Sequence, residues 1–254
     1  MTACFKTSCF LAIFLLTTTS TATANETNLK ASISAGTSLQ SGNSNNQNYN
    51  AAHALKVSNN QYGYSHSIKA FYGESGSEIY RNYFNLSNTL DYTLSNKWEF
   101  FLFQYSERDT VANLEYSIYA GAGLKYRFLN EDSWKVDFSA APVYRMQHYT
   151  GNEIGKQPAI SNRFRLFYTP AKNLQFKNIF FYVPAFHGNN SSLYTGDYAS
   201  ISSSLLAGLA ETGKTKLGLE IKYLLRYQQS PPGGVKNTDQ SLTAALNFAY
   251  DSKK

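Results

Sequence analysis

The chain has 254 residues and a net charge of +6; 16% of its residues are charged and 15% are aromatic. Disordered chains are rich in charge and poor in aromatic residues, so this composition excludes them. The longest strongly apolar run, Phe10 to Leu16, is far shorter than the roughly 20 residues of a membrane-spanning helix, which excludes a helical membrane protein.

Residues 1–24 have the pattern of a secretory signal peptide. Lys6 gives a positive start, residues 9–16 are apolar, and residues 22–24 form a small-x-small cleavage signal. We expect this segment to be removed, which leaves residues 25–254 as one exported domain.

The cysteines bear on how this domain is stabilised. Cys4 and Cys9 are the only cysteines, and both lie in the predicted signal peptide. The exported domain therefore has no thiol for a disulfide, a zinc–thiolate site or a nucleophile. We expect a large core or a closed sheet to stabilise it instead.

From about Leu29 to Tyr250, apolar and polar residues alternate in long segments. In residues 114–128 the apolar residues share one parity, whereas Glu115, Lys125 and Arg127 have the other. A helix turns by 100° per residue and would mix the two sets, whereas a strand separates them. The same alternation recurs in residues 134–146, 217–227 and 242–250.

Eleven turn signals divide the chain into twelve predicted strands. An even number of strands returns both ends of the chain to the same side. Short connections alternate with longer ones that are richer in Gly, Asn and charge, which is typical of outer-membrane barrels with short periplasmic turns and longer extracellular loops. The short connections are residues 58–63, 94–97, 129–133, 170–173 and 211–214, and the longer ones are 41–47, 74–78, 107–113, 151–157, 187–192 and 230–237.

Strand length favours a membrane barrel over a soluble sandwich. The alternating runs are 11 to 15 residues long, whereas about 9–11 residues span a bilayer and soluble strands average about half the observed length. Aromatic residues gather near strand ends, as membrane interfaces favour: Tyr49, Tyr62, Tyr80, Tyr92, Trp98, Trp134, Tyr149 and Tyr250. We therefore predict an all-β fold, a single closed antiparallel transmembrane barrel of about twelve strands, with a soluble exported β-protein as the alternative.

Three segments carry a resemblance to a known family. They are SAGTSLQSGNSNNQNYN at residues 34–50, YSIYAGAGLKYRF at 116–128 and EIKYLLRYQQSPPGGVKNTDQSLTAALNFAY at 220–250. The chain resembles the YdiY-like family of salt-induced outer-membrane proteins, a domain-of-unknown-function family of Gram-negative bacteria. The resemblance implies a barrel in the outer membrane but no chemistry. Members tend to end on an aromatic residue, which the barrel-assembly machinery recognises, whereas four residues follow Tyr250 here.

The histidines and the loop carboxylates are the first candidates for catalytic residues. His187 with Asn189, Asn190 and Ser191 has the residue types of a barrel phospholipase, and residues 107–109 have those of a barrel protease. Each set lies in a single loop of ordinary turn composition, which does not favour a nucleophile–base pair. We therefore expect that the protein is not an enzyme and has no catalytic residue. The alternative is a barrel hydrolase.

Metal and cofactor sites are not expected either. His53 and His66 lie on the apolar parity of their strands, without a third ligand at metal-binding spacing. Glycines 121 and 123 flank an alanine within a strand, where glycine relieves crowding inside a barrel rather than binding phosphate.

The remaining signal is basic charge on the parity that faces the lumen. On this parity we count fourteen basic residues and five acidic ones. This surplus predicts either a salt-bridged structural network or a lumen that binds or passes anions. The candidate residues are Lys125, Arg127, Lys135, Arg145, Arg163, Arg165, Lys222 and Arg226.

Barrel size limits what this lumen can pass. Eight strands leave an interior filled by side chains and sixteen or more leave an open channel, so twelve predict a narrow lumen. Inward-facing Tyr119, Phe167 and Phe181 narrow it further. We expect a monomer in outer-membrane lipid, with small anionic solutes as ligands and no nucleic-acid partner.

The alternation of connections predicts topology. Single cysteines at Gly42 and Gly233, in longer loops, are expected to react with a membrane-impermeant thiol reagent on whole cells. Cysteines at Asn96 and Lys172, in short turns, are expected to stay unlabelled until the outer membrane is opened. Reversed labelling would contradict the predicted orientation.

Overall fold

A computed structural model describes residues 27–41, 46–75, 78–151, 155–184, 197–229 and 236–252. The predicted signal peptide lies outside these residues, as do most of the predicted outer loops. Within the described ranges no helix is long and apolar enough to cross a membrane.

Twelve strands account for almost all of the described residues, and each begins and ends close to a predicted turn. They are β1 (Asn28–Ser41), β2 (Asn46–Ser58), β3 (Tyr62–Ser75), β4 (Glu78–Thr93), β5 (Trp98–Asp109), β6 (Leu114–Asn130), β7 (Trp134–Tyr149), β8 (Gly155–Ala171), β9 (Leu174–Val183), β10 (Tyr198–Thr212), β11 (Thr215–Gln228) and β12 (Thr238–Asp251).

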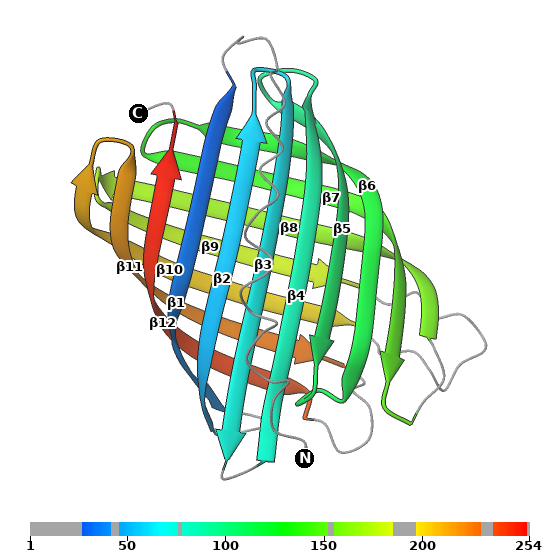
Figure 1. Cartoon of the computed structure of the whole chain (residues 1–254). Coiled ribbons are helices and arrows are strands. Elements are labelled where there is room, and N and C mark those ends of the chain that lie inside the picture. The colour runs from blue at the N-terminus through cyan, green and yellow to red at the C-terminus, as the bar shows by residue number, and fades with distance from the viewer. Residues whose placement is uncertain are drawn as a thin grey trace.

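The strands form a closed antiparallel barrel in which every strand pairs with its neighbours along the chain (Figure 1). The seam is the pairing of β1 with β12, which runs from Lys30 opposite Asp251 to Ser41 opposite Gln240. Closure leaves no strand edge, so the ladder satisfies the backbone polar groups that lipid cannot. The predicted fold class is confirmed, including the short connections after β2, β4, β6, β8 and β10.

The outer face carries the apolar parity that the sequence predicts. Leu124 and Leu246 are 47% and 54% exposed, and both lie on this face. Aromatic rings pair across strands at the end with the short turns, where Trp134 stacks on Tyr168 with centroids 4.1 Å apart. Such rings mark a membrane interface.

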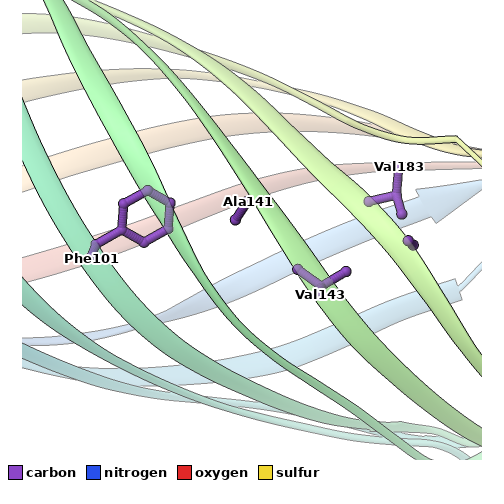
Figure 2. Packing of buried hydrophobic residues seen from close by; sticks show 5 residues of the cluster. Phe101, Ala141, Val143 and Val183 are labelled. Carbon is purple, nitrogen blue, oxygen red and sulfur yellow. The ribbon is translucent and has the colours of Figure 1, made fainter.

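Part of the interior is apolar, which the parity argument did not predict. Phe101, Ala141, Val143, Ala159 and Val183 pack together inside the barrel, from β5, β7, β8 and β9 (Figure 2). These side chains fill the lumen on one side.

Glycines of β6 make room for this cluster. A Cβ on Gly121 would come within 2.8 Å of Val143 Cγ1, and one on Gly123 within 2.6 Å of the Ala141 Cβ. The pair therefore relieves crowding inside the barrel, as the sequence predicts.

Two residues do not follow the predicted pattern. The sequence assigns Leu114 to the lipid face and Tyr149 to an aromatic girdle, but both are buried and line the interior cavity. The register between β6 and β7 shifts between Leu114 and Tyr116. This irregularity reverses the facing of Leu114, because one extra residue exchanges the two faces of a strand.

The lipid face generates a stability prediction. Leu124→Arg is expected to lower the free energy of unfolding by about 2–4 kcal/mol, because it places a charge in hydrocarbon. Leu124→Phe keeps the face apolar and is expected to change stability little. Denaturant unfolding in liposomes, followed by the fluorescence of Trp98 and Trp134, measures both. Equal effects of the two changes would contradict the assigned face.

Candidate functional site

The interior contains two cavities. The first, of about 630 Å³, extends from Asn130 and Lys135 near the short turns to Gln228 and Asn237 near the opposite end. The second, of about 700 Å³, lies along β1–β4 and β9–β12. Lys56, Ser65 and Thr89 line both, so the cavities adjoin.

Charged side chains line the first cavity, and the basic ones outnumber the acidic ones by ten to five. The acidic residues are Asp91, Glu99, Glu107, Asp137 and Asp239. Whether the surplus acts on a solute depends on which cations these carboxylates already neutralise.

Near the short turns, carboxylates neutralise three of the cations. Glu99 accepts hydrogen bonds from Lys125 and Arg127, and Lys125 also lies 3.6 Å from Asp91. Arg165 donates to both carboxylate oxygens of Asp137, at 2.7 and 3.0 Å. These pairs form because strand pairing puts Glu99 opposite Lys125 and Asp137 opposite Arg165.

In the outer half, Arg226 bridges the lumen. Its guanidinium lies 3.4 Å from Glu107, 3.6 Å from Asp109 and 3.4 Å from the Tyr83 hydroxyl. β11 and β5 are six strands apart in a twelve-stranded ring, so the bridge joins opposite walls. Gln228 donates to the Tyr149 hydroxyl at 3.3 Å beside it. These contacts constrict the lumen.

A further set of inward-facing cations has no ion-pair partner among the described residues; Lys69 and Lys222 line the first cavity and Lys177 lines the second. We call Lys69, Lys177 and Lys222 the lysine cluster. Lys177 and Lys222 both lie opposite Ser204 of the strand between them. Lys69, on the far wall, interacts electrostatically with Lys222, Arg163 and Glu220.

Aromatic rings surround the lysine cluster, and Glu220 is a carboxylate that acts on all three lysines from beyond ion-pair distance. Lys177 lies 5.5 Å from the Phe167 ring centroid, and Arg163 lies 5.4 Å from that of Phe181. No carboxylate of the described residues lies within 4 Å of Lys69, Lys177, Lys222 or Arg163. Ring faces attract cations but leave their charge in place, so this region can hold an anion.

The structure divides the eight candidate residues into three groups. Lys125, Arg127, Arg165 and Arg226 line the first cavity in ion pairs with carboxylates. Lys135, Arg163 and Lys222 line it without an ion pair within the described ranges. Arg145 is buried, with its guanidinium carbon 5.9 Å from the Tyr119 ring centroid, and does not line the cavity.

Lys69 and Lys177 are missing from the eight candidates, although their parity already places them inside. Strand parity shows that both lysines face the lumen but not that they matter more than other inward residues. They approach each other across the barrel, which the sequence does not reveal.

Among the histidines, His148 places its Nδ1 atom 2.8 Å from a carboxylate oxygen of Glu115. The described residues include no group of three or more His, Cys, Asp or Glu that could hold a metal. The hydrolase candidates His187, Asn189, Asn190 and Ser191 lie outside the described residues.

The solved structures that resemble this chain include outer-membrane channels. The NanC porin shares 11% identity over 86% of this chain and 98% of its own, with a TM-score of 0.54. A channel from Pseudomonas putida F1 shares 11% over 89% and 94%, with a TM-score of 0.49. At such identity the likeness to the NanC porin shows the fold alone, a closed β-barrel of the outer-membrane porin type.

The chain belongs to the DUF481 family, described as a protein of unknown function, which matches residues 33–250. This match agrees with the resemblance seen in the sequence, because both identify an uncharacterised family. No curated protein matches the chain.

Ion pairing predicts different costs for two inward lysines. Lys125→Ala leaves Glu99 and Asp91 with fewer partners in a largely buried site and is expected to destabilise the barrel by about 1–3 kcal/mol. Strand parity alone, without the ion pairs, predicts that Lys125→Ala changes stability only mildly. Lys222→Ala removes a cation without an ion pair and is expected to change stability by less than about 0.5 kcal/mol.

Denaturant unfolding of both variants in the same lipid measures this contrast. A Lys222→Ala variant as destabilised as Lys125→Ala would show that the lysine cluster is structural.

Proposed function

We propose that the protein is an outer-membrane barrel of a Gram-negative bacterium that passes small anionic solutes through a narrow basic lumen. The observation that carries the proposal is the lysine cluster, which faces the lumen from opposite walls and has no carboxylate of the described residues in ion-pair contact. Export through a cleaved signal peptide and insertion by the barrel-assembly machinery are part of the same proposal.

The charge balance supports anions as the solutes. Four of the five acids that line the first cavity lie within 4 Å of Lys125, Arg127, Arg165 or Arg226. The free charge between these groups is therefore positive. A low-dielectric wall focuses such a field into the lumen and raises the local concentration of anions.

The constriction limits the size of the solute. The Arg226 bridge crosses the outer half, and Phe101, Phe103 and Phe181 line the cavity below it. This geometry supports small carboxylates, phosphates or inorganic anions and disfavours a general porin. The family that the chain resembles is described as salt-induced, and a role for an anion path in adjusting cell solutes is part of the proposal.

Ion selectivity of the purified barrel in planar bilayers tests the proposal. Wild type is expected to prefer anions, and Lys69→Gln/Lys222→Gln is expected to lose most of that preference. The shift is expected to shrink as salt screens the field. The matched control, Lys97→Gln/Lys172→Gln, removes the same charge from two short turns and is expected to behave as wild type.

Two results would contradict the proposal. A barrel without conductance in any salt would refute passage. Equal loss of selectivity in the lumen variant and the turn control would show that overall charge, and not the lysine cluster, selects the ion.

A further inference from the structure

The outer wall of β2 to β5 carries a line of polar side chains among apolar ones. We call His53, His66, Asn88, Gln104 and Ser106 the polar ladder. They share the outward parity of the exposed Tyr64, Leu90 and Leu102. Their four strands lie side by side on one wall of the barrel (Figure 1).

Hydrogen bonds connect most of the ladder across strands. His66 Nδ1 donates to Asn88 Oδ1 at 2.9 Å, and Asn88 Nδ2 donates to Gln104 Oε1 at 2.9 Å. Gln104 Nε2 then donates to the Ser106 hydroxyl. The Tyr64 hydroxyl also donates to Asn88 Oδ1, at 3.0 Å. The His53 and His66 ring centroids are 6.1 Å apart.

The ladder lies at membrane depth. On β3, Tyr62 and Tyr72 are exposed on the same face, ten residues apart. Ten residues extend about 33 Å along a strand, and a tilt of about 40° reduces this to the apolar height of about 25 Å. His66 is four residues from Tyr62, so it lies inside the hydrocarbon rather than at its edge.

Polar side chains on the outer face at this depth are unusual and call for an explanation. Unpaired polar groups in hydrocarbon are costly, and polar residues there mark functional positions. β11, on another part of the wall, presents Leu217, Leu219, Ile221 and Tyr223 outward without interruption. The polar ladder is thus an extended departure from a wall suited to lipid, longer than the Asn178–Ser203 pair on the outer face of β9 and β10.

The ladder keeps hydrogen-bonding capacity at both ends. The Ser106 hydroxyl accepts from Gln104, and its own hydrogen has no partner among the described residues. His66 Nε2 has no partner within the described ranges, and in the neutral imidazole with the proton on Nδ1 this nitrogen is an acceptor. A donor therefore lies at the β5 end and an acceptor near the β3 end. Lipid acyl chains can form a hydrogen bond with neither this donor nor this acceptor.

We propose that the wall of β2 to β5 is the interface between two copies of this chain. The occupant must lie in the bilayer and offer both donors and acceptors, and a second polar ladder does so. A twofold axis along the membrane normal, in front of β4, sets β3 of one copy opposite β5 of the other. This brings the acceptor end of each ladder to the donor end of its partner.

Small residues beside the ladder allow the walls to approach. Ala51 lies opposite Ala70 on one side, and Gln104 lies opposite Ala120 on the other. Small side chains favour close packing between membrane-embedded surfaces. The proposal replaces the monomer that the sequence favours and is independent of the proposed transport, since each copy keeps its own lumen.

Disulfide formation in native membranes tests the interface. Cys4 and Cys9, both in the predicted signal peptide, are the only cysteines, so Leu86→Cys and Leu219→Cys each introduce one thiol on the outer face. Under mild oxidation, Leu86→Cys on β4 is expected to give a covalent dimer. The matched control, Leu219→Cys on β11, is expected to remain monomeric.

A second set of variants tests the ladder itself. In the Leu86→Cys background, Asn88→Leu/Gln104→Leu is expected to lower the dimer yield about fivefold or more. Asn178→Leu/Ser203→Leu is the control, because it removes an isolated outer-face hydrogen bond of 2.7 Å between β9 and β10. It is expected to leave the yield unchanged. Heat-dependent gel migration reports that each barrel is folded.

Either of two results would overturn the interface. The first is a dimer yield for Leu86→Cys no higher than for Leu219→Cys. The second is a yield that the ladder variant leaves unchanged, which would make the polar ladder a self-contained network facing lipid.

Discussion

The backbone hydrogen bond is the constraint on which the rest of this structure depends. A strand inside a membrane has no water to bond, so each of the twelve strands needs two neighbours and the sheet must close. The β1–β12 seam provides that closure. Once the sheet is closed, the pleat assigns every residue to lipid or lumen. The apolar outer face and the charged interior both follow from strand parity.

Strand pairing in the closed barrel also determines which charged side chains form ion pairs. Residues directly opposite on adjacent strands neutralise each other, as Glu99 does with Lys125 and Asp137 with Arg165. Lys177 and Lys222 instead flank a serine, and Lys69 reaches them from the far wall. Ion-paired cations, which fit a structural network, and cations without an ion pair among the described residues, which fit the proposed anion site, therefore occur in one lumen.

The period of two, the turn residues and strand length predict the barrel, the number of strands and the facing of most side chains. These signals are local, so they fail where a property depends on contacts across the barrel or on a register shift. The facing of Leu114, the Arg226 bridge and the apolar cluster around Val143 are of this kind. The sequence predicts the polar ladder only in part. Parity places His53 and His66 on the apolar face, but their hydrogen-bonded neighbours and depth appear only once strands are paired.

The central claim is that the lumen holds anions at its unpaired cations. Anomalous diffraction from crystals soaked in bromide tests it most directly, because bromide reports where the field is positive. The account predicts bromide peaks beside Lys69, Lys177, Lys222 and Arg163, and none at the Glu99 ion pairs. A lumen without bromide, or bromide only at the paired groups, would contradict it.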